Sequence, residues 1–151
     1  MIVAALLIGV VAGLRTMTAP AVIAWAAWLG WIDLAGRWAS FMASGWIILV
    51  FTVLAAVEFV TDQLPTTPSR TVPVQLSSRI VSGAFCGAVL GAIAGASLVG
   101  GIAGVVGALA GTYGGAAARA RGAAALGADR PAALVEDAAA VVLALAAVAL
   151  A

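Results

Sequence analysis

Long apolar stretches alternate with short polar ones along the whole chain. A helix that crosses a bilayer needs roughly 20 predominantly apolar residues. Four stretches come close to this length, at 41–60, 80–98, 102–118 and 132–151. The predicted connections, at 33–40, 63–78, 99–101 and 119–131, are too short to fold as soluble domains. The pattern therefore predicts an all-α membrane protein, built as a single polytopic transmembrane domain over residues 1–151.

The beginning of the chain predicts two short helices. Residues 1–14 and 19–32 are apolar but short, and the polar break Arg15–Pro20 separates them. Pro20 cannot donate a backbone hydrogen bond inside a continuous helix, and it suits the first turn of a new one. This gives about six helical segments in all. One long kinked helix, with the Arg15 side chain reaching the interface, is the alternative. Because residues 1–14 lack a basic start and a cleavage pattern, we expect no secretory signal there.

Glycine recurs at every fourth position in two of the apolar stretches. One series is Gly83, Gly87, Gly91 and Gly95, and the next is Gly107, Gly111 and Gly115. Residues four apart lie on one helix face. Small-residue faces let helices approach closely in lipid, where packing replaces the hydrophobic effect. We therefore expect a glycine-zipper antiparallel hairpin, with a homodimer interface and a pore lining as alternatives. The same faces on so small a chain also favour a homo-oligomer.

The arginines predict the orientation. With six segments, one side of the membrane carries six of them: Arg15, Arg70, Arg79, Arg119, Arg121 and Arg130. The other side carries only Arg37. The positive-inside rule then makes the arginine-rich side cytoplasmic and places both termini outside. Tryptophans gather around residues 33–40, as an aromatic belt at the outer interface does, although packing bulk explains them equally well.

Composition excludes several classes of protein. The chain is 65% hydrophobic and 9% charged, with a mean hydropathy of +1.21, whereas soluble domains carry about 25% charged residues. A net charge of +1 without lysine gives no basic surface for nucleic acid. The absence of histidine removes the commonest general base and metal ligand. A single cysteine, Cys86, excludes an internal disulfide and multi-cysteine metal sites. We predict no cofactor.

Charged residues inside the apolar stretches are the candidate site. Such residues are costly in a bilayer and usually face the bundle interior with partners. Glu58 and Asp62 lie four apart near the end of one segment, and Glu136 with Asp137 begins the last. The predicted orientation brings them to the same cytoplasmic depth as the arginines near the segment ends. The candidate ligand- or ion-binding set is Arg15, Thr16, Thr18, Glu58, Asp62, Arg70, Arg79, Glu136 and Asp137.

Two hypotheses explain this cluster. It is a buried ion-pair network that ties helices together, or it is a site for a proton, cation or small polar solute. In the network hypothesis Arg15 and Arg79 neutralise two of the four acids. The cluster therefore carries excess negative charge unless a carboxyl is protonated or a cation enters. The leading hypothesis is a small transporter or channel-like protein, with a structural or assembly protein as its rival. A transporter predicts a water-reachable cavity at the acids, and a structural protein predicts paired, dry acids.

Enzymatic activity has weaker support. The sequence has no histidine-containing triad, no Walker-type phosphate loop and no GxSxG motif. Glu58 and Asp62 could hold Mg²⁺ for phosphoryl chemistry on lipid headgroups, and the metal is otherwise undetermined. The hydroxyl- and proline-rich stretch 65–73, with Arg70, could grip a phosphate or carboxylate, or could simply be a rigid connector.

Five short motifs point to a family. They are GLRTxTxP from residue 13, ExxxDxxPxxPxR from residue 58, RxxxG from residue 79, GxYGG from residue 111 and LxED from residue 134. Together they resemble a bacterial integral-membrane family catalogued only as a domain of unknown function, over nearly the full chain. The resemblance implies a complete one-domain, multi-pass protein of the bacterial inner membrane, and it carries over no activity, substrate or catalytic residue. Its motifs coincide with the charged cluster, which favours a ligand or ion site there.

Overall fold

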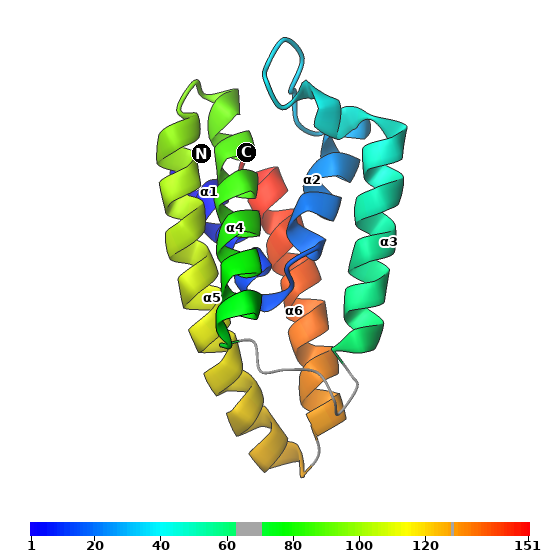
Figure 1. Cartoon of the computed structure of the whole chain (residues 1–151), viewed down its shortest axis with the longest axis vertical. Helices are drawn as coiled ribbons and strands as arrows, with labels where there is room; N and C mark the ends of the chain where they lie inside the picture. The colour runs from blue at the N-terminus through cyan, green and yellow to red at the C-terminus, as the bar shows by residue number, and fades with distance from the viewer. Residues whose placement is uncertain (63–70, 128) are drawn as a thin grey trace.

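The computed structural model describes residues 1–62, 71–127 and 129–151, and within them the chain forms α-helices and no strand (Figure 1). In chain order the elements are α1 (Ile2–Leu14), α2 (Thr18–Trp28), the short 3-10 helix η1 (Ser40–Ala43), α3 (Gly45–Thr61), α4 (Pro73–Ile93), α5 (Ser97–Leu126) and α6 (Asp129–Ala149). The predicted all-α class is confirmed. Three of these helices contain stretches long and apolar enough to cross a membrane, at Pro73–Ile93, Ser97–Ala125 and Pro131–Ala149.

Helices α1 and α2 are the two short segments that the break predicts, and the alternative of one long kinked helix is wrong. Arg15 has an extended backbone and ends α1, while Pro20 lies in the first turn of α2. Figure 1 shows α1 running from the end of the molecule that carries both termini, and α2 turning back toward that end. Their 13 and 11 residues correspond to about 20 and 17 Å, less than the roughly 30 Å of a hydrocarbon core. The break therefore lies within the depth of the bundle.

Helix α1 lies at the centre of the bundle and packs against α4, α5 and α6. Its side chains Ile8 and Val11 are fully buried. Helix α3, in contrast, packs mainly against α2 and η1, and only Ile48 and Ala55 on it are buried. Large apolar side chains cover its remaining surface, as suits a helix that faces lipid. The core is thus formed by α1 and its neighbours, with α3 at the periphery.

Three predicted connections have different bounds in the structure. The connection expected over 63–78 ends by residue 72, because α4 already begins at Pro73, a residue that suits a first helical turn. The turn expected at 99–101 lies instead at 94–96, where Gly95 adopts a positive φ of 69°. The loop expected over 119–131 is helical as far as Leu126, because α5 continues until Gly127, again at a positive φ. Alanine-rich sequence after residue 115 favours this continuation.

Helices α4 and α5 form a close antiparallel hairpin, but the glycines that mediate it differ in part from those predicted. Gly83 and Gly87 of α4 lie directly against the backbone of Gly100 and Gly104 of α5. Gly95 belongs to the turn and contributes nothing to this contact.

The second predicted series faces another helix. Gly107 and Gly111 pack on the backbone of α1, near Leu6 and Val10, and not on α4. The reason is that α5 packs against both α1 and α4, and it presents different glycines to each neighbour.

We expect Gly87→Ala to destabilise the fold. A Cβ at this position would press on the carbonyl oxygen of Gly100 and lie 2.9 Å from the Cα of Gly104, so the two backbones must separate. Overpacking of this kind costs about 1–3 kcal/mol. Gly45→Ala is the control, because a Cβ there meets no atom within 4 Å. Thermal unfolding in detergent should show a lower midpoint for Gly87→Ala alone, and equal midpoints for both variants would contradict the close contact.

Candidate functional site

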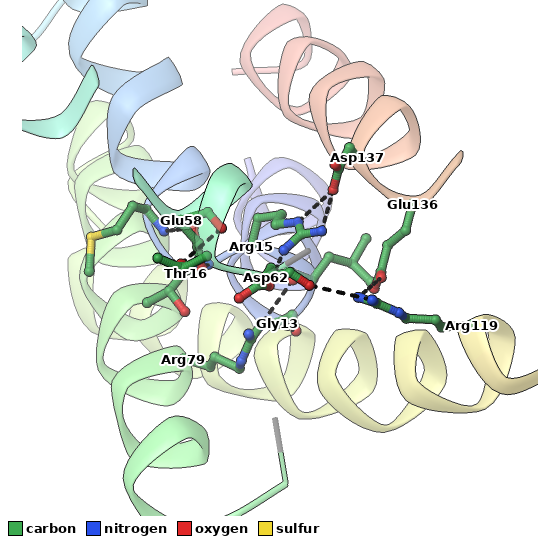
Figure 2. A network of polar contacts seen from close by, with 12 residues as sticks. Gly13, Arg15, Thr16, Glu58, Asp62, Arg79, Arg119, Glu136 and Asp137 are labelled. Atoms are coloured by element: carbon green, nitrogen blue, oxygen red, sulfur yellow. Dashed lines mark hydrogen bonds and ion pairs between the residues drawn. The ribbon is translucent and has the colours of Figure 1, made fainter. Parts of the chain in front are cut away.

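Arg15 is the centre of the candidate site (Figure 2). Its side chain is fully buried at the break between α1 and α2. Its Nε donates a hydrogen bond of 2.7 Å to Oδ1 of Asp137 on α6. Its Nη1 donates to Oδ2 of Asp62, which follows α3, and its guanidinium lies 5.6 Å from the ring centroid of Phe59. One arginine therefore joins the end of α3 to α6, two helices that are distant in sequence.

Glu58 satisfies the backbone at the start of α2. Its carboxylate oxygens accept hydrogen bonds of 2.6 and 2.8 Å from the backbone N–H groups of Thr16 and Met17. The N–H groups at a helix start lack partners within the helix and carry a partial positive charge. A carboxylate placed there accepts these hydrogen bonds and also offsets the partial positive charge. Glu58 thus fixes the C-terminal end of α3 to the break.

Arg79 donates hydrogen bonds to the backbone carbonyl groups at the end of α1. It is buried on α4, and its Nη1 donates hydrogen bonds of 2.8 Å to the carbonyl oxygens of Gly13 and Leu14. The last carbonyls of a helix lack partners within the helix and carry a partial negative charge. The sequence-based hypothesis assigned Arg79 to neutralise an acid, whereas these hydrogen bonds go to carbonyl groups.

Two hydroxyl groups donate hydrogen bonds to backbone carbonyl groups at the same break. The hydroxyl of Ser82 donates to the carbonyl oxygen of Thr16 at 2.6 Å. The hydroxyl of Thr112 lies 3.3 Å from the carbonyl oxygen of Gly13 and also bonds Ala108 within its own helix at 2.8 Å. The backbone at the break is therefore held from α3, α4 and α5.

Glu136 lies in a neighbouring pair with Arg119. Nη1 of Arg119 is 3.7 Å from Oε2 of Glu136, and its Nη2 donates to the carbonyl oxygen of Asp62 at 3.4 Å. Arg119 was not among the predicted site residues, because its position was assigned to a loop. Continuation of α5 through the alanine-rich segment was the available signal. The pair adds a charged side chain of α5 to the cluster.

The structure brings most of the predicted set together. Arg15, Glu58, Asp62, Arg79 and Asp137 meet at the break, and Thr16 takes part through its backbone. Glu136 joins through Arg119. The hydroxyl of Thr18 is buried and has no hydrogen-bond partner among the described residues. Arg70 lies outside the described residues.

Charge and exposure define what the cluster can do. Among the described residues at the break, Glu58, Asp62 and Asp137 face Arg15 and Arg79, so the formal charge of these five side chains is −1. The side chains of Asp62 and Asp137 are 14% and 13% exposed, whereas Arg15 is wholly enclosed. Their carboxylates are thus the outer members of the cluster.

The described residues include no group of three or more side chains suited to hold a metal ion. A cavity beside the cluster reaches Glu136 and Arg119, and its lining does not include Glu58 or Asp62. Pairing of the acids agrees with a structural network, while the outer position of two carboxylates and the negative sum agree with a site for a proton or cation.

We expect Arg15→Met to destabilise the protein by about 3–5 kcal/mol, because it leaves two largely buried carboxylates without their shared cation. Chemical unfolding in detergent measures this loss. Arg121→Met is the control, since Arg121 is exposed on α5. Adding Asp62→Asn and Asp137→Asn to Arg15→Met should recover part of the stability. If Arg15→Met were as stable as the wild type, these contacts would contribute nothing to the free energy of unfolding.

Comparison with known proteins identifies the family of the chain. No curated protein and no solved structure matches the chain significantly. The family model described as "Domain of unknown function (DUF4126)" matches residues 2–151, which include every helix of the bundle and every residue of the cluster. The resemblance inferred from the short motifs agrees with this match, and the chain belongs to the DUF4126 family.

Proposed function

We propose that this protein is a small transporter or channel-like membrane protein whose cluster around Arg15 binds a proton, a cation or a small polar solute. One observation carries the proposal. Two carboxylates from separate helices, Asp62 and Asp137, share a single buried guanidinium. A structural ion pair needs one acid for each base, whereas this arrangement has a second carboxylate whose charge is open to neutralisation from outside.

The broken helix supports the same proposal. Secondary transporters commonly build their ion and substrate sites from discontinuous helices, whose half-helix ends meet inside the membrane. Here α1 and α2 end and begin at the Arg15 break, and charged side chains from α3 and α4 reach it. Ionisable groups at such depth are costly, so they usually mark a functional pathway.

Charge balance favours a proton or a monovalent cation as the ligand. The negative sum at the break is removed by one positive charge. Protonation of Asp62 or Asp137 would leave one carboxylate paired with Arg15. Asp62 follows α3 and Asp137 lies on α6. Binding or release of a proton or cation at these carboxylates therefore alters how the two helices are held to Arg15. Such a change in attachment is what alternating exposure of a site requires.

A structural role is the second candidate, and one observation favours it. Each of the four acids Glu58, Asp62, Glu136 and Asp137 has a hydrogen-bond or ion-pair partner. A protein whose charges only tie helices together needs no exchange of ligands. Its stability should then be insensitive to Na⁺, K⁺ and Mg²⁺, since binding of a ligand to the folded state always stabilises it by mass action.

Proton and cation flux into proteoliposomes tests the transport proposal. With a pH-sensitive dye inside and an imposed H⁺, Na⁺ or K⁺ gradient, wild-type protein should conduct above empty vesicles. Asp137→Asn should reduce the flux at least tenfold, because it removes the exchangeable charge while keeping the side-chain size. Asp33→Asn is the matched control, since Asp33 is exposed and its carboxylate accepts a local hydrogen bond from the backbone N–H of Ala35.

Absence of flux for all three ions, together with a thermal midpoint that none of them changes, would overturn the transport proposal in favour of the structural one. Equal loss of flux in Asp33→Asn and Asp137→Asn would also contradict the assignment of the site.

The orientation is a separate prediction. The excess of arginine on one side predicts that the turn after α5 is cytoplasmic and that both termini lie outside. In a Cys86→Ser background, a cysteine at the exposed position Ala125 should resist a membrane-impermeant thiol reagent in intact cells and react after lysis. A cysteine at Ser97, near the opposite end of α5, should react in intact cells. The reverse pattern would contradict the orientation.

A further inference from the structure

The hydrogen bonds at the Arg15 break restrict the kind of ligand that the cluster can bind. Both carboxylate oxygens of Glu58 accept hydrogen bonds from the backbone at the start of α2. The carbonyl oxygens of Gly13 and Leu14 at the end of α1 accept hydrogen bonds from Arg79. Hard metal cations are bound by several oxygen ligands at once, and these oxygens already serve other donors. The two carboxylates beside Arg15 are the groups at which a ligand changes the charge of the cluster.

The Arg15 guanidinium lies against both of these carboxylates. Its Nε donates a hydrogen bond of 2.7 Å to Asp137, its Nη1 donates to Asp62, and the Phe59 ring centroid is 5.6 Å away. A metal cation that bridged the two carboxylates would lie beside this fixed positive charge, which repels it. An anionic solute would add to the negative sum at the break. A proton meets neither obstacle, because it bonds to one carboxylate oxygen and removes one negative charge.

We propose that the ligand at the break is a proton held by the acid pair Asp62 and Asp137, and that the cluster binds neither a metal cation nor an anionic solute. Resting on the transport function proposed above, this assignment names its ligand. Two strongly coupled acids titrate as a unit, so the proton belongs to the acid pair and not to one residue. Without the proton, two carboxylates face one guanidinium. With it, one carboxylate and the guanidinium balance each other.

The acid pair lies at the edge of the cluster, where a proton can reach it. The side chains of Asp62 and Asp137 are 14% and 13% exposed, whereas Arg15 is enclosed. A hydronium ion at this edge forms an O–H bond with one carboxylate oxygen and leaves as water. The neutral carboxyl group then accepts a weaker hydrogen bond from the guanidinium than a carboxylate does. Proton binding therefore loosens the hold of Arg15 on Asp62 or on Asp137.

The other ionisable groups around the acid pair offset one another in formal charge. Glu58 of α3 and Arg79 of α4 carry opposite charges and are each held by backbone groups. Arg119 of α5 lies 3.7 Å from Glu136 of α6 and offsets it. Helix α2 contributes no ionisable side chain. Among the described residues of Figure 2, the unbalanced negative charge therefore lies on the acid pair beside Arg15.

Infrared difference spectroscopy of the purified protein between alkaline and acidic buffer tests the proposal, because a protonated carboxyl group has a carbonyl band that a carboxylate lacks. The wild type should show one such band that is lost in both Asp62→Asn and Asp137→Asn. Each variant leaves one acid paired with Arg15, so that acid stays ionised and the fold is kept. Asp33→Asn is the matched control and should retain the band, because Asp33 is exposed and distant in sequence from the acid pair.

The wild type alone provides a second measurement. Saturating Na⁺ or K⁺ should change the proton concentration at the midpoint of this band by less than twofold. A larger change, or a band that persists in both Asp62→Asn and Asp137→Asn, would overturn the assignment of the proton.

Flux measurements separate this assignment from the transport proposal on which it rests. Flux of Na⁺ or K⁺ into proteoliposomes without proton movement would overturn the assignment and leave the transport proposal intact. Absence of flux for every ion, with the infrared band present as expected, would overturn the transport proposal and still support proton binding by the acid pair.

Discussion

The fold depends on how the chain satisfies backbone groups at a helix break buried within an apolar bundle. In a bilayer every such group must find a partner within the protein, since no water is available to it. The break at Arg15 leaves N–H groups at the start of α2 and carbonyl groups at the end of α1 without intrahelical partners. Glu58 accepts from the first set and Arg79 donates to the second. Each charge is placed where the helix dipole already favours it, which reduces the cost of burying it.

Close backbone packing makes this arrangement possible. Gly13 at the end of α1 lies directly against the backbone of α5, and Gly107 and Gly111 of α5 lie against α1. A side chain at any of these positions would push the helices apart and move the carbonyl groups away from Arg79 and Thr112. The glycine contacts and the polar contacts at the break are therefore parts of one geometric requirement.

The apolar pattern was enough to predict the helical class, the two short helices at the beginning and the convergence of charges at one end. Hydropathy shows where the chain is apolar, and the polar break Arg15–Pro20 clearly interrupts the apolar stretch at its beginning. The partners of individual charges were harder to predict, because they depend on the rotation of each helix about its own axis. Periodicity placed Gly107 and Gly111 on one face correctly, but it did not say which neighbour that face meets. Arg119 was missed because hydropathy alone does not distinguish a moderately polar, alanine-rich helix end from a loop.

Asp62 connects the break at Arg15 to the Arg119–Glu136 pair. Its carboxylate pairs with Arg15, and its backbone carbonyl accepts a hydrogen bond from Arg119. A proton or cation that changes the Arg15–Asp62 contact would therefore also change how the end of α3 is held to α5. The ion proposed for the break then acts on the packing of these helices through a single residue at the end of α3.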